Sequence, residues 1–100
     1  MKPGCNWFTV DGELVELDVL RFTPAGLAKI ALKIRHASTQ QEAGQVRQVQ
    51  CDIPALAFGV VAQQAGHLQL GQRVKAEGFM AQRSLKIAQL VLHIDKITLE

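Results

Sequence analysis

The 100-residue sequence contains neither a long hydrophobic run nor a recognisable targeting segment. No apolar stretch approaches the roughly 18 residues that are needed to span a bilayer. The first residues, MKPGCNWF, also lack the apolar core of a signal peptide. We therefore expect a cytoplasmic protein that does not use a membrane as a partner.

Cysteine and histidine are sparse and scattered. Cys5 and Cys51 have neither a CxxC partner nor a nearby histidine, so sequence neighbours form no zinc site and no redox motif. Cys51 alternates with Val49 and Ile53, which predicts a small, buried strand residue. The histidines, which stand apart from one another and from carboxylates in any motif spacing, are His36, His67 and His93. We expect no metal site and no histidine-based catalysis.

The short motifs of common enzymes are also missing. Ser38 and Ser84 lie outside any GxSxG frame. The eight glycines form neither GxxxxGK nor GxGxxG, the loops that cradle phosphates. No pair of nucleophile and base can be nominated, so a small hydrolase is disfavoured. The sequence predicts a binding protein that is not an enzyme and carries no cofactor.

The composition is that of an ordinary folded chain, with 48% hydrophobic and 20% charged residues. We expect one domain over residues 1–100, large enough for a modest core. The net charge of +2 is only mildly basic, so the distribution of charge matters more than its sum. Four acids cluster between residues 11 and 18 and four bases follow between residues 29 and 47, which indicates local fields of opposite sign.

Residues 28–35 alternate between apolar and mostly basic side chains. The apolar set is Ala28, Ile30, Leu32 and Ile34, and the opposite set is Lys29, Ala31, Lys33 and Arg35. A period of two is typical of a strand, with one set on each face. The pattern predicts a strand that buries one face in a core and presents a cationic face to a polyanion.

The rest of the chain divides into further strands and one helix. Trp7 to Leu20 reads as a first strand whose inward parity changes at Gly12, which predicts a β-bulge there. The turn Thr23 to Gly26 leads into the cationic strand. The polar loop Ser38 to Gly44 separates that strand from a third, at about Val46 to Ile53.

A short helix is expected to follow the third strand. Pro54 suits a first helical position, and Gly66 is a plausible C-cap. Gln72 to Met80 then reads as a fourth strand, Ala81 to Lys86 as a loop, and Ile87 to Leu99 as a fifth strand with a break near Asp95. Three strands, a helix and two strands are typical of an OB-fold. We therefore predict an all-β, five-stranded Greek-key barrel with a short helix between its third and fourth strands.

In an OB-fold barrel the ligand surface is the outer face of the second and third strands, bounded by the loops that join strands one to two and four to five. Seven cations fall on that surface or its loops, so we expect them to contact DNA phosphates: Arg21, Lys29, Lys33, Arg35, Arg47, Arg83 and Lys86. A solvated strand face with no ligand would show the same pattern.

Aromatic residues are rare, and none falls on the expected cationic face. Only Phe22, before the first turn, is well placed to stack on a base. Phe58 and Phe79 are predicted to lie in the core. Binding should therefore be electrostatic and nearly indifferent to nucleotide sequence.

Two segments resemble the primosomal replication protein N family, also called the PriB family. The first carries HxS…QEAGxxRQxxCxxP between His36 and Pro54, and the second carries VxxxGF and LVLHxxxI between Val74 and Ile97. The resemblance implies a homodimeric OB-fold without enzymatic activity that binds single-stranded DNA, joins the replication-restart primosome and stimulates the helicase PriA.

The resemblance also bears on single residues. Arg47 matches a family arginine on the third strand, Arg21 matches a basic residue of the first loop, and Arg83 with Lys86 falls in the basic loop between the last two strands. Where some relatives place aromatic residues on the third strand, this chain has Gln45 and Gln50.

Two hypotheses therefore remain open. The first is an accessory replication protein that holds single-stranded DNA on a cationic face and hands it to a helicase. The second is a protein-interaction adaptor of the primosome with weak or no direct DNA binding, which the polar Gln45, Gln48 and Gln50 favour, because amides hydrogen-bond well and stack poorly.

Overall fold

The computed structural model describes residues 3–100, in which six strands and one short helix follow one another. Their bounds are β1 Phe8–Leu17, β2 Arg21–Phe22, β3 Ala28–Glu42, β4 Gln45–Phe58, α1 Val60–Ala65, β5 Arg73–Gln82 and β6 Leu90–Leu99. The two-residue β2 only extends the edge of β3, and the other five strands form a closed barrel. The predicted all-β OB-fold barrel, with its helix between the third and fourth long strands, is confirmed.

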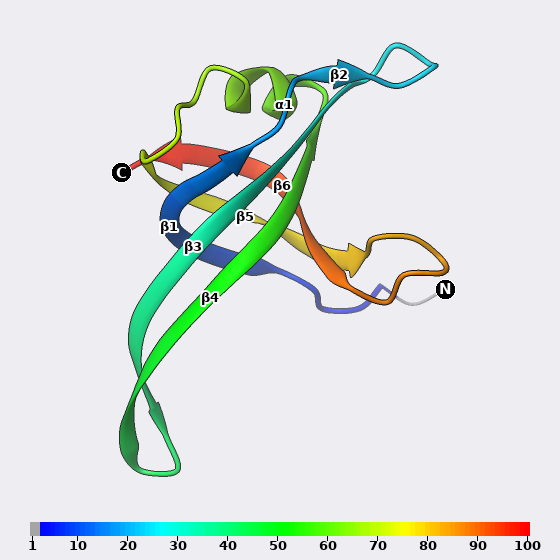
Figure 1. Cartoon of the computed structure of the whole chain (residues 1–100). Helices are drawn as coiled ribbons and strands as arrows, with labels where there is room; N and C mark the ends of the chain where they lie inside the picture. The colour runs from blue at the N-terminus through cyan, green and yellow to red at the C-terminus, as the bar shows by residue number, and fades with distance from the viewer. Residues whose placement is uncertain (1–2) are drawn as a thin grey trace.

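β1 closes the barrel because it pairs with two strands in succession. Residues 8–13 pair with β5, and residues 13–17 pair with β3. The sheet order is β1-β5-β6-β4-β3-β2, and neighbouring strands pair antiparallel except for β4 with β6, which are parallel. Figure 1 shows the curled sheet with α1 at one end, where Ala62 and Ala65 are buried. The closed sheet has an inner face for the core and an outer face for a ligand.

The alternation in β3 is confirmed. The inward set Ala28, Ile30, Leu32 and Ile34 is at most 4% exposed, and Lys29, Lys33 and Arg35 point to the outer side. Small and branched side chains from the other strands complete the interior. The largest fully buried side chains are Leu14, Ile30, Ile34, Val74, Val91 and Leu92.

The bulge of β1 lies after Gly12 and not at it. The register with β3 shifts between Leu14 and Glu16, so Leu14 points inward and Val19 is 69% exposed. Gly12 has a different reason to be glycine: a Cβ at this position would collide with the carbonyl oxygen of Arg35. The predicted bulge position was therefore wrong. Glycine occurs at position 12 because two backbones approach closely there, and not because the strand bulges.

β3 and β4 form a longer hairpin than the sequence predicted. They pair from Lys29 with Phe58 out to Glu42 with Gln45, so the expected loop over residues 38–44 shrinks to Ala43 and Gly44. Both turn residues have positive φ, and such turns match the twist of paired strands. In Figure 1 the far part of this hairpin projects from the barrel. We call residues 36–51 the arm.

The arm explains why the prediction for Cys51 was wrong. Cys51 is exposed and lies opposite His36. The ring of His36 is partly buried against Asp11 of β1, with its Nδ1 2.8 Å from the Asp11 carbonyl oxygen, but no apolar layer of the barrel covers Cys51. A buried face needs a facing element as well as the right period.

The helix begins later than predicted. Residues 54–58 belong to β4, with Ala55 and Ala57 buried, and α1 starts only after Gly59, whose φ is 68°. Pro54 lies just before β6 begins to pair with β4, where one side of the strand is open and proline is tolerated. Gly66 caps the end of α1 as expected, and its N–H donates to the carbonyl of Ala62.

The last hairpin also differs in its bounds. β5 continues to Gln82 and β6 begins at Leu90, so the loop covers residues 83–89. The register shifts where Gly78 pairs with Ile94 and Glu77 with Lys96, which leaves Asp95 as the extra residue of a bulge. The expected break near Asp95 is therefore a bulge in a strand that continues from Leu90 to Leu99. A Cβ at Gly78 would collide with the carbonyl oxygen of His93, so the strands approach closely there.

Candidate nucleic-acid interface

The structure brings most of the seven predicted cations to one side of the barrel. Arg21 pairs across from Lys29, and Lys33 and Arg35 follow along the outer side of β3. Arg83 and Lys86 lie in the loop between β5 and β6. These six cations therefore surround the outer face of β3 and β4, as an OB-fold ligand surface requires.

Arg47 lies apart from the other six. It is in the arm, directly opposite Gln40, and even-numbered residues of β3 share the side of Ile34, not the side of Arg35. The sequence placed Arg47 beside the cations of β3 because it predicted a shorter hairpin. Register is a property of the pairing and cannot be read from one strand.

Four of the seven cations form ion pairs with carboxylates. The pairs are Arg21 with Asp18 at 3.7 Å, Lys33 with Glu16 at 3.3 Å, Arg35 with Asp52 at 2.9 Å and Arg47 with Glu42 at 3.0 Å. A phosphate that meets one of these cations must replace a carboxylate or share the cation with it. The cationic face is therefore partly neutralised before any ligand arrives.

The pair between Arg35 and Asp52 has the best geometry. The two residues lie opposite each other on β3 and β4. Arg35 donates two hydrogen bonds, from Nε to Oδ1 at 2.9 Å and from Nη2 to Oδ2 at 3.1 Å. This fork lowers the pKa of Asp52, because the guanidinium hydrogen-bonds the ionised carboxylate.

Within residues 3–100, Lys29, Arg83 and Lys86 form no ion pair. The Nε of Arg83 donates to Oε1 of Gln89 at 2.8 Å, and the hydroxyl of Ser84 accepts from the backbone N–H of Lys86. These bonds brace the loop and leave the positive charges free for a phosphate.

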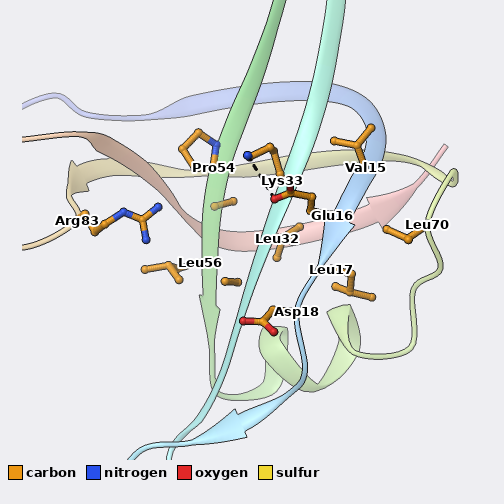
Figure 2. Close-up of a pocket in the computed structure, with 12 residues that line it drawn as sticks. Val15, Glu16, Leu17, Asp18, Leu32, Lys33, Pro54, Leu56, Leu70 and Arg83 are labelled. Carbon is orange, nitrogen blue, oxygen red and sulfur yellow. Dashed lines mark ion pairs between the residues drawn. The ribbon is translucent and has the colours of Figure 1, made fainter.

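A groove of about 500 Å³ runs over the outer face between the two loops. Figure 2 shows Glu16 and Asp18 on one side, Lys33 and Leu56 near β3 and β4, and Arg83 reaching in from the opposite side. One wall is thus acidic and the other is basic. A polyanion in this groove meets Arg83 and has to displace Glu16 from Lys33.

Three aromatic rings lie in a row on the neighbouring outer surface. The ring centroids of Phe58 on β4 and His93 on β6 are 5.9 Å apart, and those of His93 and Phe79 on β5 are 5.1 Å apart. The ring planes differ by only 19° and 15°. The ammonium of Lys29 lies 5.8 Å from the Phe58 centroid. We call Phe58, His93 and Phe79 the aromatic row.

The aromatic row corrects two predictions. Phe79 is 45% exposed and Phe58 is only partly buried, so neither belongs to the core as expected. The error began with residues 54–58, which were assigned to a helix. Because Ile53, Ala55 and Ala57 point inward, strand alternation would have turned Phe58 outward. Phe22 is 62% exposed on β2, and its role in stacking stays a prediction.

Within residues 3–100, no group of three His, Cys, Asp or Glu residues is close enough to hold a metal ion. No helix in this part of the chain is long and apolar enough to cross a bilayer.

The chain was then compared with known proteins. Residues 6–96 match the model of a family whose description is "Another single-strand binding protein family". The chain is 35% identical over 89 residues to the replication restart protein PriB of Nitrosomonas europaea, which covers 89% of this chain and 82% of the relative.

Solved structures show the same likeness. PriB from Ralstonia solanacearum superposes with a TM-score of 0.87 at 30% identity, covering 97% of this chain and all of that one (100%). A deletion mutant of the single-stranded DNA binding protein from Thermus aquaticus gives a TM-score of 0.78 at 27% identity, covering 97% of this chain and 51% of that chain.

Proposed function

Because this chain belongs to the PriB family of single-strand binding proteins, we propose that it binds single-stranded DNA non-specifically as an accessory protein of replication restart. The observation that supports this most strongly is the groove between the acidic segment 16–18 and the loop 83–89, which has cations on its floor and rim. Such a groove suits the sugar-phosphate backbone, which has the same charge whatever the base sequence.

The proposed activity is positioning, in which no bond is made or broken. The protein holds an unpaired strand and presents it to the primosomal helicase PriA, whose unwinding it stimulates. Replication restart takes place in the bacterial cytoplasm, which is therefore the proposed location. An unwinding assay with and without this protein tests the stimulation, and an unchanged PriA rate would contradict it.

The salt dependence of DNA binding tests the electrostatic part. If all seven cations released a counterion on single-stranded DNA, the slope of log K against log salt would be about −5. With four cations already in ion pairs, we expect about −2, from the three others. Fluorescence anisotropy of a labelled oligonucleotide over a salt series measures the slope. A flat response would contradict the proposal.

We also propose that the protein is a homodimer that pairs through β1. Residues 8–12 pair with β5 along one edge, while β3 pairs with β1 only from Glu13 onward. Apart from the carbonyl of Asp11, which hydrogen-bonds the ring of His36, the other edge of this half-strand is open to a second copy within residues 3–100, and antiparallel pairing would satisfy its backbone groups. Sedimentation equilibrium measures the mass, and a monomer at all concentrations would contradict this assembly.

A second candidate is an adaptor that joins primosome proteins and binds DNA weakly or not at all. The four ion pairs favour it, since they reduce the charge available to phosphates. A pull-down of PriA in the presence and absence of an oligonucleotide separates the two candidates. An adaptor retains PriA and shows no anisotropy change with the labelled strand.

A further inference from the structure

The charges that line the groove are divided unevenly between its two sides. Around the end of β1 the lining residues are acidic or apolar: Val15, Glu16, Leu17, Asp18 and Leu70. Lys33 lies on the floor, and Arg83 reaches in from the opposite side (Figure 2). Within residues 3–100 Arg83 forms no ion pair, whereas Lys33 is paired with Glu16. We call Glu16 and Asp18 the acidic wall.

Both carboxylates of the acidic wall are held in place by neighbouring groups. Oδ1 of Asp18 accepts a hydrogen bond from the backbone N–H of Val19 at 2.8 Å and lies 3.7 Å from Nη2 of Arg21. Oε2 of Glu16 lies 3.3 Å from the ammonium of Lys33. The side chains of Asp18 and Glu16 are 52% and 66% exposed, so they act on charges at the mouth of the groove, within a Debye length of about 8 Å.

We propose that the acidic wall makes the groove selective for single strands, because it repels the second backbone of a DNA duplex. This inference rests on the proposed function, since it concerns the same groove. A single strand has one flexible backbone, which can follow Lys33 and Arg83 and keep clear of the acidic wall. A duplex carries one phosphate charge per about 1.7 Å of axis and is stiff over about 50 nm. It cannot turn one backbone away from the acidic wall while the other stays on Arg83.

The size of the groove adds to this effect. Its volume of about 500 Å³ is that of a site for a drug-sized ligand, so a short piece of an unpaired strand can enter it. A duplex cannot enter, because its major groove alone is about 12 Å wide. It has to rest on the rim, where its phosphates meet Arg83 on one side and the acidic wall on the other. Repulsion by the acidic wall then offsets attraction by Arg83.

A simpler role for the two acids leads to a different result. If Glu16 and Asp18 only neutralise Lys33 and Arg21, removal of their charge frees both cations for any phosphate. Single-stranded and duplex DNA then gain affinity by the same factor. If the acids also repel a second backbone, duplex DNA gains more. The ratio of the two affinities therefore separates the two roles.

The experiment uses a labelled single strand of about 12 nucleotides, a length that one OB-fold can cover, and the duplex of the same sequence. Fluorescence anisotropy at one salt concentration gives both affinities, and the wild type should prefer the single strand. In the double variant Glu16→Gln, Asp18→Asn this preference should fall by about twofold to twentyfold, the effect of two exposed charges. The matched control Asp95→Asn, Glu100→Gln makes the same changes at exposed positions that do not line the groove, and it should keep the wild-type preference.

The outcomes distinguish this inference from the proposed function. If the wild type binds neither DNA, both fail together. If the wild type binds the single strand and the duplex equally well, or if the double variant keeps the full preference, the acidic wall does not select the strand and the electrostatic function stands. An equal fall in the matched control assigns the effect to net charge and also overturns the inference.

Two further variants guard against a misfolded protein. Glu16→Asp, Asp18→Glu keeps both charges and should keep the preference, whereas its loss would assign selectivity to side-chain shape and overturn the inference. Glu16→Gln alone leaves the hydrogen bond between Asp18 and the Val19 N–H intact. If the double variant binds neither DNA, this single variant replaces it and should lower the preference by about 1.4-fold to fivefold. An unchanged preference in the single variant then contradicts the inference.

Discussion

The two halves of the β3–β4 hairpin share one continuous register and differ in their surroundings. In the near half, residues 28–35 and 53–58 have one side packed in the barrel. In the arm, the residues of both strands are exposed or only partly buried. The comparison teaches that a period of two makes a core only where another layer faces the strand.

The same contrast applies to the charges. In the near half, Lys29 and Lys33 stand on a strand whose other side is fixed by packing, so their positions relative to the groove are defined. Within residues 3–100, Arg47 in the arm is held only by Glu42. The near half therefore offers a shaped surface, and the arm offers side chains that can rearrange around a ligand.

The largest difference that we expect between the two halves of the hairpin is in their contribution to the free energy of unfolding. Ile34 is fully buried in the near half, whereas Val46 in the arm is 66% exposed. We expect Ile34→Ala to lower the free energy of unfolding by about 2–5 kcal/mol, because it leaves a cavity. Val46→Ala should change it by less than about 0.5 kcal/mol. Urea denaturation measures both, and a large effect of Val46→Ala would show that the arm packs against another copy.

A smaller effect is expected on DNA binding. Lys29 is in no ion pair within residues 3–100, whereas Arg47 is paired with Glu42. Lys29→Ala should make the salt slope shallower by about 0.7, the share of one phosphate on a single strand. Arg47→Ala should change the slope less, because Glu42 already neutralises this arginine. Anisotropy over a salt series compares the two, and a larger loss for Arg47→Ala would place the DNA on the arm.

The near half also shows what the sequence alone could predict. The alternation from Ile30 to Ile34 uses large apolar residues, so both its strand and its inward face were evident. Residues 54–58 continue the same logic with alanines, and two alanines between larger residues do not distinguish a strand from a helix. The position of Phe58 on the outer face was lost with that assignment.

The ion pairs could not be predicted from the pattern of any single strand. Arg35 and Asp52 are 17 positions apart, and they meet because Glu42 pairs with Gln45 at the turn. A shift of the register by one residue would place Asp52 on the other face. The positive φ of Ala43 that fixes this turn is unusual for alanine, so composition gave no signal of it. The order of strands and helix in the OB-fold was predicted correctly, because it depends only on the succession of elements and not on the register between them.

The smallest effect expected is that of Asp52→Asn, which releases Arg35 from its carboxylate. At neutral pH the variant should bind DNA with a salt slope steeper by up to about 0.7, because Arg35 becomes available to a phosphate. Asp95→Asn is a matched control, since it makes the same change of side chain at an exposed position in the bulge of β6, and Asp95 forms no ion pair within residues 3–100. An unchanged slope in Asp52→Asn would mean that DNA does not reach Arg35.

The pH dependence of stability gives the same pair an independent test. Hydrogen bonds from Arg35 lower the pKa of Asp52 below its ordinary value of 3.8, so the folded state favours the ionised carboxylate. The stabilisation is fully present above the unfolded pKa and is lost as pH falls through the lower folded pKa. Asp52→Asn should therefore melt slightly below the wild type at neutral pH, and the difference should vanish in strong acid. Because both side chains are exposed, the difference is small, and a gap that persists below both pKa values would assign the effect to packing instead of charge.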